Sequence, residues 1–288
     1  MKHLTFSIGI GMSIMIYACS PRTNRANDAP NHYPETILGW KLGAQAYTFK
    51  RFTFFEAVEK IDSCQLRYVE GYPGQELGAG IKGKLDFKVD QLQQRIVLDA
   101  LKKRKVKMVA FGVVKPADVA EWRQLFTFAK AMGIQTLVTE PDKNHIDLIS
   151  KLCDEFKISV AIHNHANPSP YWHPDSVLAV VKGRSKYLGA CADVGHWVRS
   201  GLDPTACLKK LDGRVLHLHM KDLDKKNTKS AHDLIWGTGV TGIPEIIQEL
   251  KRQQFKGIIS AEYEYNWLSN SVDVAQSVAW FRRNLDVK

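Results

Sequence analysis

Eight apolar runs of β type alternate with eight helical patterns along most of the chain, and this alternation most constrains the fold. A strand followed each time by a helix predicts a parallel sheet. Eight such units in about this length are typical of a closed (β/α)8 TIM barrel, so we predict one α/β domain over residues 36–288. The predicted strands are Leu42–Tyr47, Tyr68–Glu70, Val106–Val113, Thr136–Thr139, Ser159–His163, Tyr187–Asp193, Arg214–His219 and Gly257–Glu262.

The helical patterns lie near residues 54–63, 89–103, 116–132, 146–156, 175–181, 204–210, 244–253 and 272–285. An open doubly wound sheet is the alternative arrangement, but its glycine fingerprint is missing after the first predicted strand. A G-x-G-x-x-G match does occur at Gly78, Gly80 and Gly83, without an apolar helix at its end. We therefore interpret it as a mobile loop and a candidate lid. A second long connection spans residues 222–242.

The first residues have the pattern of an export signal. A basic start, Met1-Lys2-His3, precedes an apolar run over residues 4–17 that is too short to span a bilayer. Ala18 and Cys19 follow, and this stretch resembles the lipobox at which bacterial lipoproteins are lipidated on cysteine. The sequence predicts a signal peptide over 1–18, lipidation at Cys19, a tether over 19–35, and a lipid-anchored, periplasm-facing protein of the bacterial cell envelope. A plain signal peptide is the alternative.

Net charge is +10, which by itself permits contact with nucleic acid or an anionic membrane. The densest basic run, residues 102–107, ends a predicted helix, where cations are favoured by the helix dipole. We therefore expect no nucleic-acid partner, and no membrane contact except through the anchor. Four cysteines follow Cys19 without metal-binding spacing and are expected to be buried free thiols: Cys64, Cys153, Cys191 and Cys207.

Polar side chains gather where the predicted strands end, which is the face that carries chemistry in such barrels. Asp193, His219, Glu262 and Glu140 come from four different strands. Three carboxylates and one imidazole converging on one point are suited to a divalent ion such as Mn, Mg, Co or Zn. Without an ion, the three carboxylates would repel one another.

Further polar residues extend this expected site. Side chains two residues apart on a strand share a face, as His163 and His165 do, and as His217 and His219 do. We assign catalytic roles to His165, Glu262, His196 and Lys221, and substrate binding to Gln45, Tyr47, Glu70, His163, His217 and Trp197. Four tryptophans also follow strands and are either stacking platforms for a ligand or covers for the barrel mouth: Trp172, Trp197, Trp236 and Trp267.

Several of these motifs together resemble the xylose-isomerase-like superfamily, in particular bacterial sugar phosphate isomerases/epimerases. They are Gly43–Tyr47, His163–His165, Asp193–His196, His219–Asp222 and Glu262. The resemblance implies one divalent metal held by two Glu, one Asp and one His. The Asp maps onto Asp193, the His onto His219 and the last Glu onto Glu262. This chain has His163 where the first Glu normally stands. Either Glu140 or His163 supplies the fourth ligand, and we expect Glu140.

The resemblance implies a metal-dependent sugar isomerase or epimerase that acts through an enediolate, with a small carbohydrate as its partner. Export favours free or oxidised sugars over sugar phosphates. A lyase or hydratase acting on 3-keto-glycosides uses the same site, and a non-catalytic sugar-binding lipoprotein is a further alternative. Endonuclease IV shares this barrel, but an exported protein does not meet cellular DNA, so we do not expect DNA as the substrate. The sequence does not indicate an oligomeric state.

Overall fold

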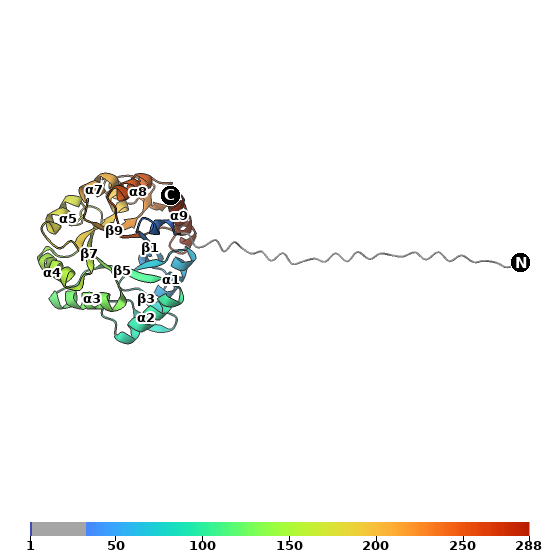
Figure 1. Ribbon diagram of the computed structural model, residues 1–288, viewed down its shortest axis with the longest axis horizontal. Coiled ribbons are helices and arrows are strands. Elements are labelled where there is room, and N and C mark those ends of the chain that lie inside the picture. The colour runs from blue at the N-terminus through green and yellow to red at the C-terminus, as the bar shows by residue number, and fades with distance from the viewer. Residues whose placement is uncertain (2–32, 288) are drawn as a thin grey trace. The chain divides into compact units, whose positions relative to one another are not determined.

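The computed structural model describes Met1 and residues 33–287. Eight parallel strands close into a barrel in the order β1-β12-β9-β8-β7-β6-β5-β2, and helices surround it (Figure 1). The predicted (β/α)8 fold is therefore confirmed. The compact unit begins at Tyr33, three residues before the expected boundary. The expected signal peptide, Cys19 and the tether up to residue 32 lie outside the described residues.

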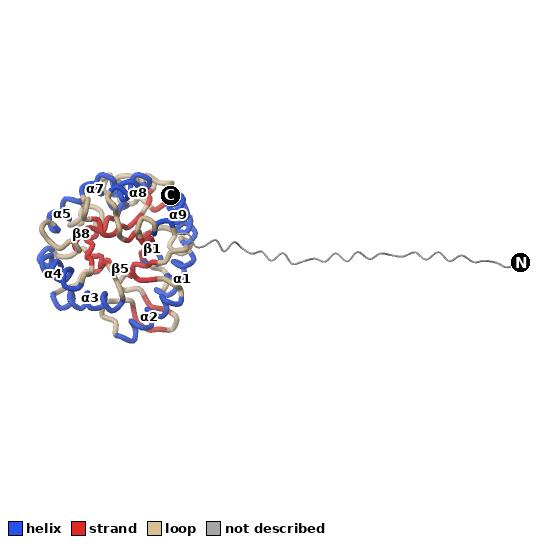
Figure 2. The backbone as a smooth tube through the Cα atoms, in the orientation of Figure 1, coloured by secondary structure: helices blue, strands red, loops and turns tan. Residues whose placement is uncertain are grey.

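All eight predicted strands form, with ends that differ by a few residues from those expected. They form an inner ring that the helices enclose (Figure 2). Their bounds are β1 Lys41–Gln45, β2 Tyr68–Gly71, β5 Lys107–Val114, β6 Thr136–Thr139, β7 Ser159–His163, β8 Leu188–Asp193, β9 Val215–Met220 and β12 Ile258–Ala261. The parallel register places Asp193 beside His219, and His219 beside Ser260. Functional side chains of three neighbouring strands therefore lie at one height.

The outer helices begin at recognisable caps. Thr53 and Glu56 form a capping box at the first helix, and Asp90 and Gln93 form another at the second. The helices that follow barrel strands are α1 Phe54–Ser63, α2 Gln91–Lys103, α3 Val119–Met132, α4 Ile146–Phe156, α5 Pro174–Val181, α6 Val194–Arg199, α7 Pro204–Lys210, α8 Ile243–Arg252 and α9 Ser271–Arg283. The short helix α6 was not predicted, and Asp193 caps it through its side chain.

Successive side chains along each strand face alternately outward to the helices and inward to the barrel interior, which gives two separate regions of core. On β8, Leu188, Ala190 and Ala192 face the helices and join the main apolar cluster. Cys191 faces inward and packs with Val138 and Ala161 in a small cluster. A polar layer of Glu70, His217 and Ser260, each at most 1% exposed, is also buried. The barrel interior is thus filled with side chains, as the fold requires.

Two predicted loops contain small sheets. The stretch with the G-x-G-x-x-G match, expected to be a loop, contains an antiparallel hairpin of β3 Glu76–Gly78 and β4 Ile81–Lys84. The connection after β9 contains β10 Asp222–Leu223 and β11 Asp233–Leu234. Short 3-10 helices η1 Pro34–Thr36, η2 Ala46–Phe49 and η3 Lys143–His145 complete the described elements. The four predicted thiols are free and buried, as expected.

Among the described residues, no helix is long and apolar enough to cross a membrane.

Candidate metal centre and active site

Four strand ends bring two imidazoles and two carboxylates together at the mouth of the barrel. His163 ends β7, Asp193 ends β8, His219 lies near the end of β9, and Glu262 follows β12. One ligand atom from each of these four residues lies within 4.8 Å of the others. Residues from four separate strands therefore form one potential ligand set of two nitrogens and two oxygens, which is suited to Zn, Mn, Co or Fe.

The Oδ2 atom of Asp193 is the centre of this set and is buried without a hydrogen-bond partner. Four ligand-type or cationic nitrogens face it: His163 Nε2 at 3.5 Å, His219 Nδ1 at 3.7 Å, His196 Nε2 at 3.8 Å and Lys221 Nζ at 3.5 Å. Leaving such an atom unpaired is costly because nothing replaces its hydration. A cation held between Asp193, His163 and His219 satisfies it, so the residues present fit a divalent metal.

Carboxylates behind the two imidazoles fix which nitrogen faces the metal position. Glu140 accepts a hydrogen bond of 2.9 Å from Nδ1 of His163, which leaves Nε2 directed at Asp193. Glu70 accepts one of 2.9 Å from Nε2 of His219, which leaves Nδ1 directed at Asp193 and Glu262. Metal-binding histidines usually have such a partner, because it orients the ring and raises its basicity.

Lys221 is a buried counter-ion beneath Glu262. Its Nζ lies 2.6 Å from Glu262, 2.8 Å from Glu264 and 3.5 Å from Asp193. Gly195 makes room for it, since a Cβ there would lie 2.7 Å from Cδ of Lys221. Burial raises the pKa of Glu262, but the charges of Lys221 and His219 outweigh it and hold that pKa well below its ordinary value. Glu262 is therefore ionised, as a ligand or a base must be.

A cavity of about 280 Å³ opens onto these residues. Six predicted site residues line it: Gln45, Tyr47, His163, His165, His196 and Glu262. His165 donates through its backbone N–H and its Nδ1 to Oε1 of Glu140, so its ring is held at the cavity wall. Burial, with the nearby charge of Lys221, lowers the pKa of His196 to about 3. His196 is therefore a neutral hydrogen-bonding group at neutral pH.

Some predicted roles do not fit the geometry. Glu140 is not one of the four residues grouped around Asp193, because His163 lies between it and Asp193; it forms a separate group of potential ligands with His163 and His165. Glu70 and His217 are buried below the site and bond each other at 2.8 Å, so they support ligands and do not line the cavity.

Burial argues against direct contact with a ligand for three further residues. Trp197 is 1% exposed and packs in the main core on α6, which gives it no surface for a sugar. Trp236 is likewise 2% exposed. Lys221 is 1% exposed and absent from the cavity wall, so it acts on the carboxylates and has no direct path to substrate.

Five cavity residues were missed: Tyr72, Pro73, Gly112, Val113 and Glu264. Tyr72 and Pro73 directly follow β2, so a search of every residue after a strand would have found them. Gly112 contributes backbone, since its carbonyl accepts a 2.8 Å hydrogen bond from Gln45, and no sequence pattern marks such a role. Glu264 shares a strand face with Glu262 and was visible by spacing alone.

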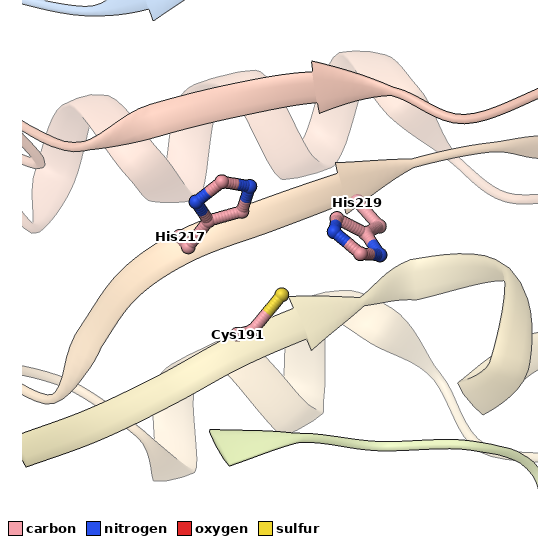
Figure 3. A group of neighbouring side chains, drawn as sticks. All are labelled: Cys191, His217 and His219. Carbon is pink, nitrogen blue, oxygen red and sulfur yellow. The ribbon is translucent and has the colours of Figure 1, made fainter. Parts of the chain in front are cut away.

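Cys191, His217 and His219 form a second group with metal-ligand atoms, deeper in the barrel (Figure 3). Both histidines already donate through Nε2 to Glu70, at 2.8 and 2.9 Å. Burial raises the pKa of the Cys191 thiol to about 12, so the thiol is neutral. We therefore assign this group to the hydrogen-bonded layer that supports His219.

Asp222 organises the connection that borders the site after β9. Its Oδ2 accepts hydrogen bonds from the backbone of Gly237 at 2.8 Å and Gly239 at 2.9 Å, and its Oδ1 from Thr241 at 3.0 Å. A Cβ at Gly239 would lie 2.4 Å from Oδ1 of Asp222, so glycine is required there. The Asp of the His219–Asp222 motif is thus structural.

Comparison with known proteins places this barrel in a family. The sequence pattern described as "Xylose isomerase-like TIM barrel" matches residues 112–284. A solved structure of an uncharacterised protein from Parabacteroides distasonis is 35% identical, with a TM-score of 0.71, and the match covers 85% of this chain and 99% of that one. The chain belongs to the xylose isomerase-like TIM barrel family. The resemblance seen in the sequence motifs is thereby confirmed.

More distant structures share the fold of this family. A D-tagatose 3-epimerase-like protein is 16% identical, with a TM-score of 0.66 over 85% of this chain and 97% of its own. An IolI protein with a bound zinc atom is 15% identical, with a TM-score of 0.63 over 85% of this chain and 97% of its own. The curated proteins compared with the chain include no match. At these identities the likeness shows the shared fold.

Proposed function

We propose that the protein is a divalent-metal-dependent sugar isomerase or epimerase that removes a proton next to a carbonyl of a free or oxidised sugar. One observation carries the proposal: the unpaired Oδ2 of Asp193 lies among ligand nitrogens beside a cavity that His165 and Glu262 line. The cavity, of about 280 Å³, has the size of a site for a monosaccharide unit.

His163, Asp193, His219 and Glu262 are the proposed metal ligands, with Glu70 and Glu140 orienting the two imidazoles. A bound divalent ion would polarise the sugar carbonyl and stabilise the negative charge that develops when the neighbouring C–H proton leaves. Lys221 keeps the carboxylates of Glu262 and Glu264 ionised by its positive charge.

His165 is the proposed base. Its Nδ1–H is held by Glu140, so Nε2 is free to accept the proton from carbon. Returning that proton to the neighbouring carbon gives an isomer, and returning a proton to the opposite face of the same carbon gives an epimer. Glu262, which also lines the cavity, is the second group able to move a proton. His196 is neutral and hydrogen-bonds a substrate hydroxyl.

An aromatic wall supports a sugar as ligand. The ring of Tyr47 packs edge-to-face on Tyr72 at 5.3 Å and on Trp267 at 5.8 Å between centroids. Tyr47 and Tyr72 line the cavity, and aromatic faces cover the apolar faces of sugar rings. From the predicted export signal and the proposed anchor at Cys19, we further propose that the protein acts in the cell envelope, where free and oxidised sugars from glycan breakdown are the accessible substrates.

Deuterium exchange tests the proposal. Purified protein is incubated with Mn and a panel of free sugars and 3-keto-glycosides in D2O, and products are followed by NMR. We expect deuterium at one carbon of a substrate and a new sugar isomer. The variant Asp193→Asn should abolish exchange, whereas Asp147→Asn, whose side chain is 77% exposed on α4, should leave it unchanged. Metal-free protein that exchanges at the full rate would contradict the proposal.

A lyase or hydratase acting on 3-keto-glycosides is the second candidate. His163 holds the position at which the resemblance implies a glutamate, and the two carboxylates on the described cavity wall, Glu262 and Glu264, both follow β12. Loss of a substituent from the neighbouring carbon needs only one base to form the same enediolate. Release of an aglycone together with exchange would identify this reaction. Sugar binding without any exchange would identify a non-catalytic binding protein.

A further inference from the structure

Basic residues form a ring at the end of the barrel opposite the active-site mouth. Because all eight barrel strands are parallel, their first residues lie at that end. Seven of the eight strands begin at a Lys or Arg or have one within the two preceding residues: Lys41, Arg67, Lys107, Lys157, Lys186, Arg214 and Lys256. We call these residues the basal ring.

Ion pairing neutralises little of the basal ring. Arg67 pairs with Asp62. Among residues 33–287, the other six members form no ion pair with a carboxylate, and Lys107, Lys157, Lys186 and Lys256 are exposed. The ammonium groups of Lys157 and Lys186 lie 5.7 and 5.4 Å from the ring of Tyr187, so two positive charges flank one aromatic without an anion. The dipole of α4 favours the cation of Lys157, which caps the C-terminus of that helix, whereas Lys186 lies outside the helices.

A depression of about 250 Å³ lies within the basal ring. Lys41 and Lys256 line it together with the polar side chains of Gln135, Thr136 and Ser159. Cations and hydroxyl or amide donors around a small hollow are the groups that bind a phosphate oxygen.

The chain enters the barrel at the same end. Tyr33, the first described residue of the compact unit, packs against the guanidinium groups of Arg67 and Arg282, at 5.6 and 4.6 Å from its ring. Backbone of Lys41 then bonds Gly257 at 3.1 Å as β1 begins. Tyr33 is fourteen residue steps after Cys19 in the sequence, a length of chain that reaches roughly 50 Å at full extension.

We propose that the basal ring rests on the anionic phospholipid surface of a membrane, and this inference builds on the lipid anchor proposed at Cys19. Charge complementarity and the entry point of the tether both select this end. The opposite end carries the buried carboxylates Asp193 and Glu262 and the half-buried Glu264, so the mouth faces away from the membrane and towards soluble sugars. Each Lys near an anionic membrane surface adds attraction within about one Debye length, ~8 Å at physiological salt. This inference does not depend on the proposed reaction.

Vesicle flotation tests the inference with residues 33–288, which contain the whole closed barrel and its core. The untethered barrel should float with vesicles that contain phosphatidylglycerol, remain in solution with pure phosphatidylcholine, and detach as salt is raised. The variant carrying Lys41→Gln, Lys107→Gln, Lys157→Gln and Lys186→Gln should bind roughly tenfold or more weakly.

A matched variant controls for net charge, with Lys82→Gln, Lys143→Gln, Lys226→Gln and Lys229→Gln placed away from the basal ring. It should keep its binding within about twofold, because charge position and not total charge governs contact at short range. Equal loss in both variants, equal binding to neutral vesicles, or no binding to anionic vesicles at low salt would overturn the proposal. Circular dichroism of both variants should match that of the parent barrel.

Discussion

Glu70 and His219 are 149 residues apart in sequence and are joined by a 2.9 Å hydrogen bond at the floor of the active site. Glu70 lies near the end of β2, across the barrel from the strands that supply the proposed metal ligands, and it is 1% exposed. Its Oε2 also accepts a hydrogen bond of 2.8 Å from Ser260. The bond therefore crosses the barrel interior and sets which nitrogen of His219 faces Asp193.

Replacing Glu70 should weaken metal binding without removing a ligand. Glu70→Gln keeps the shape of the side chain but loses the charge that raises the basicity of His219, so we expect roughly 10- to 100-fold weaker metal affinity. Isothermal titration with Mn or Zn measures this. Glu249→Gln, a buried carboxylate bound to Arg252 far from the site, should stay within about twofold. Unchanged affinity in Glu70→Gln would show that the contact does not tune the ligand.

His163 and Glu140 should differ sharply in their effect on metal content. His163→Ala removes a ligand nitrogen and should abolish stoichiometric metal, as measured by elemental analysis after dialysis. Glu140→Gln leaves His163 in place and should lower affinity only about 10- to 100-fold. The reverse order would restore Glu140 as the fourth ligand. Glu155→Gln on the exposed side of α4 serves as the control.

Metal affinity should rise with pH. Burial lowers the pKa of His219, but the charges around it, including those of Glu70 and Glu262, outweigh burial and hold that pKa well above 6.5. At neutral pH the metal must therefore displace a proton from His219, and displacement becomes easier as pH rises. Titrations in two buffers of different ionisation enthalpy should show proton release on binding. Binding that is equally tight at pH 6 and pH 8 would contradict this assignment.

The four cysteines of the barrel should resist alkylation in the native state. Burial raises the pKa of Cys64 to about 11 and those of Cys153, Cys191 and Cys207 to about 12, so almost no thiolate is present at neutral pH. Iodoacetamide followed by mass spectrometry should find no modified cysteine in residues 33–288 under native conditions and four after unfolding. Rapid native labelling of any one would reveal local opening at that site.

The sequence predicted the barrel because every strand and outer helix has its own local pattern. Period-two and helical spacing, with caps such as Thr53 and Asp90, are properties of neighbouring residues and can be identified without tertiary information. The hairpin at residues 76–84 was missed because it has no such local pattern. Its glycines suggested a flexible loop, and the pairing of Glu76 with Lys84 follows from backbone hydrogen bonds that leave little compositional trace.

The site was only partly predictable. Strand-end position correctly placed Asp193, His219 and Glu262 at the mouth, but it could not distinguish a ligand from a residue behind a ligand. Glu140 and His163 end neighbouring strands, and only their three-dimensional order shows that the imidazole lies between the carboxylate and Asp193. Lys221 illustrates the same limit, because its burial depends on the space left by Gly195.

His165 should act as the base, and this can be separated from a purely orienting role. Its side chain lines the cavity, and Glu140 holds its Nδ1, so Nε2 is the atom available to substrate. His165→Gln keeps a hydrogen-bonding group but has no nitrogen that accepts a proton. We expect metal content and melting temperature to be retained and the rate of deuterium exchange to fall roughly 10²-fold or more. His232→Gln, on the loop before β11, should leave the rate unchanged.

The outcome also tests the competing assignment. His163 and His165 both bond Glu140, so a merely structural His165 would disturb His163 when replaced and lower metal content together with the rate. Loss of rate with full metal therefore identifies proton transfer, whereas a parallel loss of both identifies support of the ligand. If the exchange rate of His165→Gln stays within a few-fold of that of the parent, a group other than His165 accepts the proton. Glu262 is then the base to replace next, because it is ionised and lines the same cavity.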